Sequence, residues 1–309
     1  MSENTENAET RCGFVAVLGA PNAGKSTLVN ALVGSKVSIV TPKAQTTRTI
    51  VRGIAIYGKS QVVYLDTPGI FQAKKRIERA MVAAAWSGAG DADLIMLVID
   101  AAKESRAQHL SADNEQIIAD IKKSDRKALL ILNKVDVCEK ASLLDLTARL
   151  NALEAFNEIF MVSALTGDGL DQMRTHLATL MPPGPWMFPE DDISDMPLRL
   201  LAAEITREKL FLRLRQELPY SCAVEVERWE EKKDGSVRID QIVFVSRESH
   251  RPIVLGHGGQ NIKAIGASAR VELEKLLDRR VHLFLHVKVN ERWGDERSFY
   301  SAWGLDFNA

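Results

Sequence analysis

The chain has 309 residues, of which 46% are hydrophobic and 26% are charged. This length suits two domains of ordinary globular composition better than one. The 40 Lys and Arg residues are balanced by 41 Asp and Glu residues, which excludes a broad basic surface for non-specific nucleic-acid binding.

Neither disulfides nor a membrane span is expected. The 3 cysteines lie far apart and have no Cys-x-x-Cys spacing, which excludes a disulfide framework and a thiolate zinc site and fits a reducing compartment. No run of about 18 apolar residues predicts a transmembrane helix. The polar, acidic start of the chain resembles neither a secretory signal nor an Arg-rich transit peptide, and we expect residues 1–12 to form a disordered tail.

Residues 13–181 alternate between short apolar runs and amphipathic helical patterns. Such alternation is typical of a doubly wound α/β sheet, with the apolar runs as buried parallel strands. The predicted strands are 13–19, 50–58, 61–66, 93–100, 128–133 and 160–165, and the predicted helices are 25–33, 111–123, 141–155 and 170–180.

A different domain follows a break in composition. Residues 182–197 contain five of the chain's 10 prolines together with acidic residues, and they are predicted to be an extended linker. Residues 198–309 then give the order helix, strand, strand, helix, helix, strand, with an Asp-Gly hairpin signal at 234–235. We predict a small α+β domain.

The segment 19–26 matches the phosphate-binding pattern GxxxxGK[ST]. It leaves a predicted strand and opens a predicted helix, which is the context that the pattern requires. Glycines let consecutive backbone N–H groups turn toward phosphate oxygens, and the helix N-terminus adds partial positive charge. Lys25 is expected to reach the β- and γ-phosphates, and Ser26 to bind Mg²⁺. The predicted phosphate contacts are Gly19, Ala20, Pro21, Asn22, Ala23, Gly24, Lys25, Ser26 and Thr27.

A second phosphate element, Asp-Thr-Pro-Gly, ends the strand 61–66. An acid at this place can hold Mg²⁺, and the glycine N–H can sense the γ-phosphate. The residues assigned to this element are Asp66, Thr67, Pro68 and Gly69.

Two further elements predict that the base is guanine. Asp136, which follows the strand 128–133, can accept hydrogen bonds from both guanine N1–H and the 2-amino group, whereas adenine offers no such donors on that edge. The backbone N–H of Ala164 is expected to meet guanine O6. The predicted base-site residues are Asn133, Lys134, Asp136, Ser163, Ala164 and Leu165.

In this order the four elements resemble a translation-factor-related P-loop GTPase. The resemblance places switch I at about 36–50 and switch II at about 67–90. Relatives with a Thr-Thr-Arg switch I indicate Thr47 as the residue that closes on Mg²⁺ and the γ-phosphate, although Thr46 and Thr47 could also be an ordinary polar loop. The predicted metal ligands are Ser26, Thr47 and Asp66, and the predicted catalytic residues are Asn22, Lys25, Thr47 and Gly69.

The residue that follows the Asp-Thr-Pro-Gly element is Ile70, which cannot orient a water molecule as the glutamine of Ras-like enzymes does. Asn22 resembles the P-loop asparagine that helps to bind K⁺ in relatives with a hydrophobic residue at that place, and K⁺ could then replace the charge of an arginine finger. A turn-stabilising role for Asn22 explains it equally well. Switch II is rich in Lys and Arg between residues 72 and 79, either as a solvated helix face or to meet RNA or an acidic partner.

The second domain carries a Gly-x-x-Gly loop at 256–259. An apolar segment before it and a helix after it match the KH signature, in which the loop clamps the backbone of about four nucleotides. Ile253, Leu255 and Ile262 are expected to line an apolar groove for bases. The predicted RNA-binding residues are Arg251, Gly256, His257, Gly258, Gly259, Gln260 and Lys263.

A P-loop GTPase followed by a KH domain resembles the Era family over nearly the whole chain. The resemblance implies a doubly wound α/β GTPase domain at 13–181, a type II KH domain at 198–309, and GTP/GDP with Mg²⁺ as ligands. It further implies binding near the 3′ end of small-subunit ribosomal RNA, assistance in 30S subunit maturation, and a cytoplasmic location with loose inner-membrane association in bacteria. We expect a monomer. Two alternatives remain, a GTPase of tRNA modification and a constitutive RNA-binding scaffold with a structural nucleotide.

Overall fold

The computed structural model describes residues 10–126 and 128–309, which divide into two compact units. The first takes its described residues up to Ser38, then Thr47–Asp195 and Trp303–Ala309, and the second takes Ile39–Thr46 and Met196–Ala302. Most of the expected disordered tail lies outside the described residues. Its last two residues, Arg11 and Cys12, already belong to strand β1 (Arg11–Leu18), so the tail was predicted to be too long.

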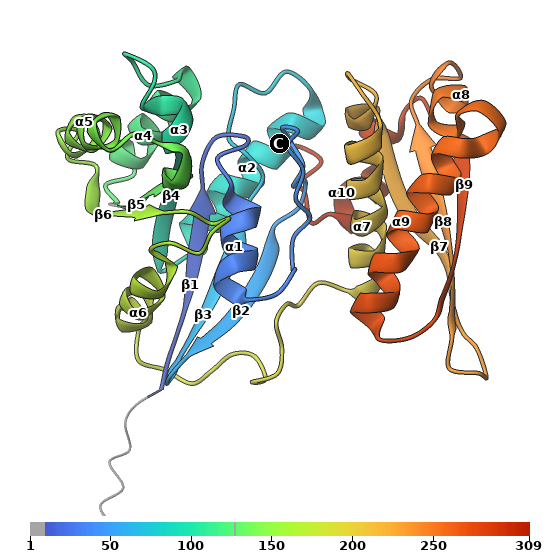
Figure 1. Ribbon diagram of the computed structural model, residues 1–309, viewed down its shortest axis with the longest axis horizontal. Helices are drawn as coiled ribbons and strands as arrows, with labels where there is room; N and C mark the ends of the chain where they lie inside the picture. The colour runs from blue at the N-terminus through green and yellow to red at the C-terminus, as the bar shows by residue number, and fades with distance from the viewer. Residues whose placement is uncertain (1–9, 127) are drawn as a thin grey trace, which may run out of the picture. The chain divides into compact units, whose positions relative to one another are not determined.

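The first unit is built around one mixed sheet of six strands in the order β2-β3-β1-β4-β5-β6 (Figure 1). Strand β2 runs antiparallel to β3, while the other neighbouring strands are parallel. The strands are β1, β2 (Val51–Tyr57), β3 (Ser60–Asp66), β4 (Leu94–Asp100), β5 (Ala128–Asn133) and β6 (Phe156–Val162). The helices are α1 (Lys25–Val33), α2 (Arg76–Asp91), α3 (Ala101–Glu104), α4 (Ala112–Lys123), α5 (Lys140–Asn151) and α6 (Leu170–Leu180).

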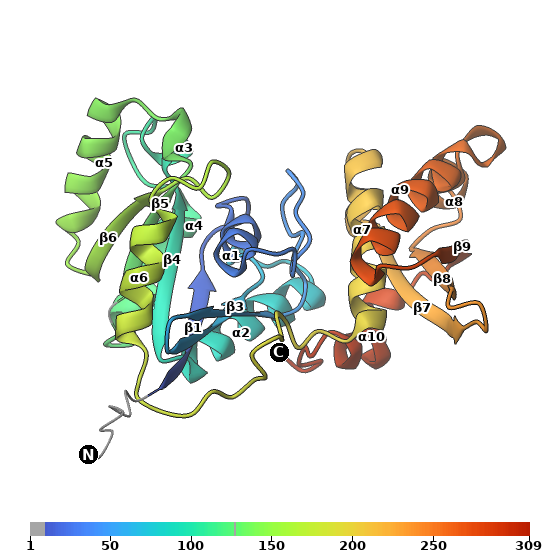
Figure 2. The same ribbon diagram turned by 60° about the horizontal axis from the view of Figure 1, so that its bottom comes forward.

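Helices cover both faces of this sheet. Alternate residues of the central strands, such as Leu97 and Ile99 of β4, form one buried cluster with side chains of α2, α4 and α5. Helices α1 and α6 lie on the opposite face, against β2 and β3 (Figures 1 and 2). The doubly wound α/β fold class is therefore confirmed.

Strand β6 and helices α2 and α3 differ from the sequence prediction, in which neither helix was expected. Strand β6 occupies Phe156–Val162 instead of 160–165, because the chain pairs with β5 four residues earlier than its most apolar stretch suggests. Helix α2 was not predicted, since its sequence reads as a charged switch segment. Its start is fixed by Glu78, whose Oε2 accepts from the backbone N–H groups of Lys74 at 2.8 Å and Lys75 at 3.1 Å.

The proline-rich segment before the second unit is held against the first unit. Gln61 of β3 is fully buried, and its side chain bonds the Phe188 carbonyl at 2.8 Å and the N–H groups of Met187 at 2.9 Å and Phe188 at 3.0 Å. Further along, the Ile54 N–H of β2 donates to the Ile193 carbonyl at 2.9 Å. The expected extended linker is thus a fixed strap along the sheet up to Asp195.

The second unit is one sheet in the order β7-β8-β9, with α7 and α9 on one face and α10 in contact with the other face, where Phe299 packs on Phe244. Strands β7 and β8 are antiparallel, and β8 and β9 are parallel. Apolar residues of α7 and α9 pack on the sheet in its core. The elements are α7 (Leu198–Arg213), β7 (Cys222–Glu231), β8 (Val237–Val245), α8 (His250–Leu255), α9 (Gln260–Leu277), β9 (Val281–Val289) and α10 (Arg297–Ala302).

The order from α7 to β9 agrees with the predicted α+β domain, whereas α10 was not predicted. The end of the predicted second domain also differs, because residues Trp303–Ala309 belong to the first unit. Within residues 10–126 and 128–309, no helix is both long enough and apolar enough to cross a bilayer.

Candidate functional site

The loop between β1 and α1 has a shape that only glycine allows at two of its positions. A Cβ at Gly19 would lie 2.3 Å from the Val98 carbonyl oxygen, and a Cβ at Gly24 would lie 2.2 Å from Asn133 Nδ2. Both glycines also have positive φ angles, of 150° and 96°. The loop therefore packs its backbone directly against the ends of β4 and β5 and leads into the N-terminus of α1.

Lys25 lies beneath this loop. Its Nζ donates to the carbonyl oxygens of Gly19 at 3.0 Å and Ala20 at 3.1 Å. Burial lowers the pKa of the Lys25 ammonium to about 8, and the charge of Asp66 acts in the opposite direction. A buried cation whose hydrogen bonds go to neutral carbonyl oxygens is suited to receive a phosphate anion.

The three predicted metal ligands come together at the start of α1. Ser26 Oγ and Thr47 Oγ1 lie 2.9 Å apart and form a hydrogen bond. Asp66 is fully buried, and neither of its carboxylate oxygens has a hydrogen-bond partner among the described residues. Burial raises the pKa of Asp66. The nearby Ser26 and Ser38 hydroxyls and the charge of Lys25 act in the opposite direction, because they favour the charged carboxylate.

This arrangement fits Mg²⁺. An unpartnered buried carboxylate is costly unless a cation or donor compensates it, and Mg²⁺ prefers hard oxygen ligands of this kind. The hydroxyl oxygens of Ser26 and Thr47 lie beside each other, so both can bind one Mg²⁺ ion together with Asp66. Each of the three can do so directly or through a water molecule. The geometry supports the assignment of Thr47 over Thr46, because the Thr46 hydroxyl bonds the Lys43 carbonyl at 2.8 Å and Thr41 Oγ1 at 2.6 Å.

The loop after β3 lies across the P-loop. A Cβ at Gly69 would approach Pro21 to 3.0 Å, and the next backbone N–H, that of Ile70, donates to the Gly19 carbonyl at 3.1 Å. The Thr67 hydroxyl points into the fold, where it donates to the Val17 carbonyl at 2.7 Å. The Gly69 backbone is thus close to the phosphate loop, whereas the Thr67 side chain stabilises the fold by joining the end of β3 to β1.

Asn133 joins three loops of the nucleotide site. Its Nδ2 donates to the Ala23 carbonyl at 2.9 Å, and its Oδ1 accepts from the Ala164 N–H at 3.0 Å. The same Ala164 N–H is predicted to meet guanine O6, and in this structure it donates to Asn133.

The neighbouring residues leave Asp136 available for a base. Lys134 has a positive φ of 67°, and its Nζ binds the Asn22 carbonyl at 2.8 Å and Asp100 Oδ2 at 2.5 Å. This holds the P-loop to the end of β4. Asp136 and Leu165 are exposed, and Ser163 is buried, where its hydroxyl accepts from the Thr166 N–H at 3.1 Å.

In the second unit, the Gly-x-x-Gly loop joins α8 to α9. Gly256, Gly258 and Gly259 all have positive φ, and a Cβ at Gly256 would lie 2.9 Å from the Asn261 backbone nitrogen. The space around Gly258 is open, so a side chain there would project from the loop. The Arg251, His257, Gln260 and Lys263 side chains are exposed on and around this loop.

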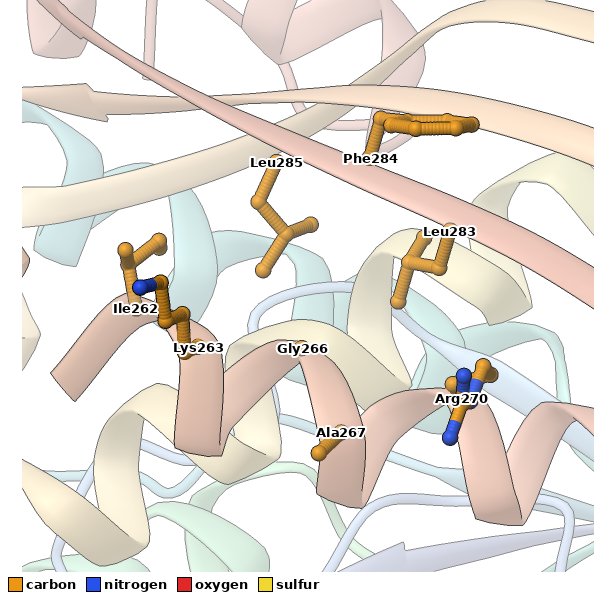
Figure 3. Close-up of a pocket in the computed structure, with 8 residues that line it drawn as sticks. All are labelled: Ile262, Lys263, Gly266, Ala267, Arg270, Leu283, Phe284 and Leu285. Carbon is orange, nitrogen blue, oxygen red and sulfur yellow. The ribbon is translucent and has the colours of Figure 1, made fainter. Parts of the chain in front are cut away.

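A groove of about 330 Å³ lies between the start of α9 and strand β9 (Figure 3). Its lining contains two cationic side chains, Lys263 and Arg270, and no carboxylate. Phe284 is 45% exposed, and the Arg238 Cζ lies 4.8 Å from its ring centroid. The groove is lined by Ile262, Lys263, Gly266, Ala267, Arg270, Leu283, Phe284 and Leu285.

The predicted groove residues are only partly correct. Ile262 lines the groove, but Ile253 lies outside it, and Leu255 packs against the core of the unit. Phe284 and Arg270 were missed. The available signal for Phe284 was its place on the polar face of the strand, between His282 and His286. No such signal existed for Arg270, because its position depends on the packing of α9 against β9.

Two family models match parts of the chain. A model described as 50S ribosome-binding GTPase matches residues 14–134, and a KH domain model matches residues 217–294. Among curated proteins, GTPase Era of Rhizobium meliloti (strain 1021) is 56% identical over 298 residues, covering 96% of this chain and 94% of the relative. GTPase Era of Brucella suis biovar 1 (strain 1330) is 55% identical over 303 residues, covering 98% and 96%.

Solved structures agree over the same length. A crystal structure of a single-residue variant of Aquifex aeolicus Era bound to GDP·AlF4⁻ has a TM-score of 0.89 at 38% identity, covering 96% of this chain and 99% of its own. A structure of Era with MgGDPNP and nucleotides 1506–1542 of 16S ribosomal RNA also has a TM-score of 0.89 at 38% identity, with the same coverage. Together with the site described above, these likenesses show that the chain belongs to the Era family of GTPases.

Proposed function

We propose that the chain is a GTP-hydrolysing switch that binds the 3′ end of small-subunit ribosomal RNA and assists 30S subunit maturation. The observation that carries the proposal is the pairing of two sites in one chain. One is the buried, unpartnered Asp66 carboxylate beside Ser26 and Thr47, and the other is the carboxylate-free groove beside the Gly-x-x-Gly loop. The Era structure with MgGDPNP and 16S rRNA nucleotides supports this combination of ligands.

The reaction is the attack of water on the γ-phosphorus of GTP, which breaks the bond to the β–γ bridging oxygen and yields GDP and phosphate. Lys25 neutralises charge on the β- and γ-phosphates, and Thr47 and the Gly69 N–H meet the γ-phosphate side. Ser26, Thr47 and Asp66 would hold Mg²⁺, which supplies further charge neutralisation when bound. Asp136 selects guanine.

Ile70 has no group that can orient the attacking water, and its side chain is buried. Intrinsic hydrolysis should therefore be slow, on the order of 10⁻⁴–10⁻³ s⁻¹, as for unassisted GTPases. We propose that K⁺ increases this rate near Asn22, which has a positive φ of 64° and an exposed side chain. Faster single-turnover hydrolysis in K⁺ than in Na⁺, lost in Asn22→Ala, is the expected result, and equal rates in both salts would contradict it.

The switch is tested by RNA affinity in three nucleotide states. The probe is an oligonucleotide of the 3′ end of 16S rRNA, labelled for fluorescence anisotropy, with a scrambled sequence as control. We expect tighter binding with a GTP analogue than with GDP. Equal affinity in the empty, GDP and GTP-analogue states would favour the scaffold alternative, and preferential crosslinking to tRNA in cells would favour the tRNA-modification alternative.

We further propose that the protein is a cytoplasmic monomer with loose association at the inner membrane. Sedimentation of the purified protein tests the first part. Fractionation of cells, with a salt wash of the membrane pellet, tests the second, and complete absence from that pellet would contradict it.

A further inference from the structure

Thr47 lies where the two compact units divide the chain. The residues before it, Ile39–Thr46, belong to the second unit, although they lie within switch I. Conversely, the last residues of the chain, Trp303–Ala309, belong to the first unit. Thr47, which is expected to meet the γ-phosphate, is therefore preceded by a segment of switch I that belongs to the second unit.

The two residues that follow Thr47 are held by Trp303. The Thr49 hydroxyl donates to the Trp303 carbonyl at 2.7 Å, and the Arg48 Cζ lies 5.4 Å from the centroid of the Trp303 ring. Both Arg48 and Trp303 are only 4% exposed. A buried guanidinium stacked on an indole is a directional contact, in which the ring face fixes where the cation lies.

The C-terminal segment also reaches switch II. The Arg76 Cζ, at the first residue of α2, lies 4.6 Å from the Phe307 ring centroid. The same seven residues thus contact both switch segments, and Leu305 between the two aromatic residues is buried.

The residue before Thr47 is held within the second unit. The Thr46 carbonyl accepts from Arg207 Nη2 at 2.5 Å, and the Arg207 guanidinium is buried and paired with Glu204, with Nε donating to Oε1 at 2.7 Å. Because Glu204 fixes the guanidinium, the Thr46 carbonyl has a defined position within the second unit.

We propose that Trp303 is a positioning residue for GTP hydrolysis, which acts through Arg48 and Thr49 to place Thr47 beside the γ-phosphate and Mg²⁺. The inference rests on the proposed function, since it assigns Thr47 to the γ-phosphate. GDP has no γ-phosphate, so its binding does not need this placement. Core packing alone predicts a different outcome, in which the loss of Trp303 weakens GDP and GTP binding together.

The test compares two variants that remove one contact each. Trp303→Leu removes the aromatic face but retains apolar bulk, and Thr49→Val removes the hydroxyl with little change of shape. Trp303→Phe retains an aromatic face and is the rescue variant. Trp186→Leu is the matched control, because Trp186 packs on the core of the same unit and donates to the Lys59 carbonyl at 3.0 Å, away from the switches.

For each protein we would measure single-turnover GTP hydrolysis, and the affinities for GDP and a non-hydrolysable GTP analogue across a Mg²⁺ titration. Trp303→Leu and Thr49→Val should lower the hydrolysis rate about 10- to 100-fold, as a misplaced catalytic group does. They should also weaken analogue binding and require more Mg²⁺ for it, while GDP affinity stays at the wild-type value. Trp303→Phe should recover most of the rate.

Unchanged hydrolysis in both variants, or parallel losses of GDP and analogue affinity, would overturn the positioning role. A wild-type protein without hydrolysis would refute the proposed function instead. In that case the ratio of analogue to GDP affinity still tests the placement of Thr47, so the two failures are distinguishable.

Discussion

The amide of Asn133 holds the nucleotide site together before any nucleotide binds. It makes two buried hydrogen bonds with backbone groups of other loops, to the Ala23 carbonyl and from the Ala164 N–H. Asn133→Ala removes both partners at once. An orphaned buried polar group costs about 1–3 kcal/mol, so the two together predict about 2–6 kcal/mol of lost loop stabilisation.

This loss has two separate readouts. The GDP dissociation constant, measured by displacement of a fluorescent analogue, should rise by at least about 30-fold, because about 1.4 kcal/mol corresponds to a factor of ten. Hydrogen–deuterium exchange of the peptide around Ala164, measured without nucleotide, should accelerate, since its N–H loses its acceptor.

The matched control is Asn114→Ala. Asn114 lies on α4 and is as buried as Asn133, each being 2% exposed. Its Nδ2 donates to Glu104 Oε1 of α3 at 2.9 Å. Its loss should destabilise the unit without a selective effect on GDP affinity. Wild-type GDP affinity and unchanged exchange at Ala164 in Asn133→Ala would refute the reasoning.

Three other substitutions test separate parts of the assignment. Asp66→Asn removes the buried, unpartnered carboxylate, so the nucleotide-free protein should be at least as resistant to urea as the wild type. GTP binding should no longer depend on Mg²⁺, and a retained Mg²⁺ requirement would contradict the assignment of Asp66 as a metal ligand. Asp136→Asn should shift the binding preference from GDP to xanthosine diphosphate by about 100-fold or more, because the new amide can donate to the xanthine 2-oxygen. Competition between the two nucleotides measures this preference, and a retained preference for GDP would contradict the assignment of Asp136 to the base. Gly258→Asp places a carboxylate in open space on the RNA loop and should weaken binding of the rRNA oligonucleotide about tenfold at low salt, measured by anisotropy, whereas unchanged affinity would exclude this loop from the interface.

The nucleotide site could be predicted largely because its elements are local. Each phosphate or base element follows a buried strand, and the carboxyl ends of parallel strands meet at one edge of a sheet. Lys25, Ser26, Thr47 and Asp66 therefore converge as their positions in the motifs imply. What the motifs could not give was the use of individual donors. The Ala164 N–H was assigned to the base, but its bond to Asn133 depends on how close two loops approach in the folded protein.

The RNA groove and the C-terminal segment were less predictable for a related reason. Arg270 comes to line the groove only when α9 packs on β9, and Phe284 points to the opposite face of β9, where its ring meets Arg238 of the neighbouring strand (Figure 3). Trp303 and Phe307 lie in a short segment without periodicity, so no local pattern signals that they meet arginines more than 200 residues earlier. Such contacts are determined by tertiary packing and carry no signal in sequence spacing.

The strap formed by the proline-rich segment has a consequence for self-association. Strand β2 is at an edge of the six-stranded sheet, where unpaired N–H and C=O groups could recruit a strand from another molecule. Three residues of β2 contact the strap. The Ile54 N–H donates to the Ile193 carbonyl, Gly53 forms an antiparallel β-bridge with Ser194, and Arg52 forms an ion pair with Asp195 at 2.6 Å. The prolines of the strap cannot donate to a further ladder, and its acidic residues repel a second copy of the same segment. The connection between the two units therefore also protects the β2 edge of the sheet against edge-to-edge aggregation.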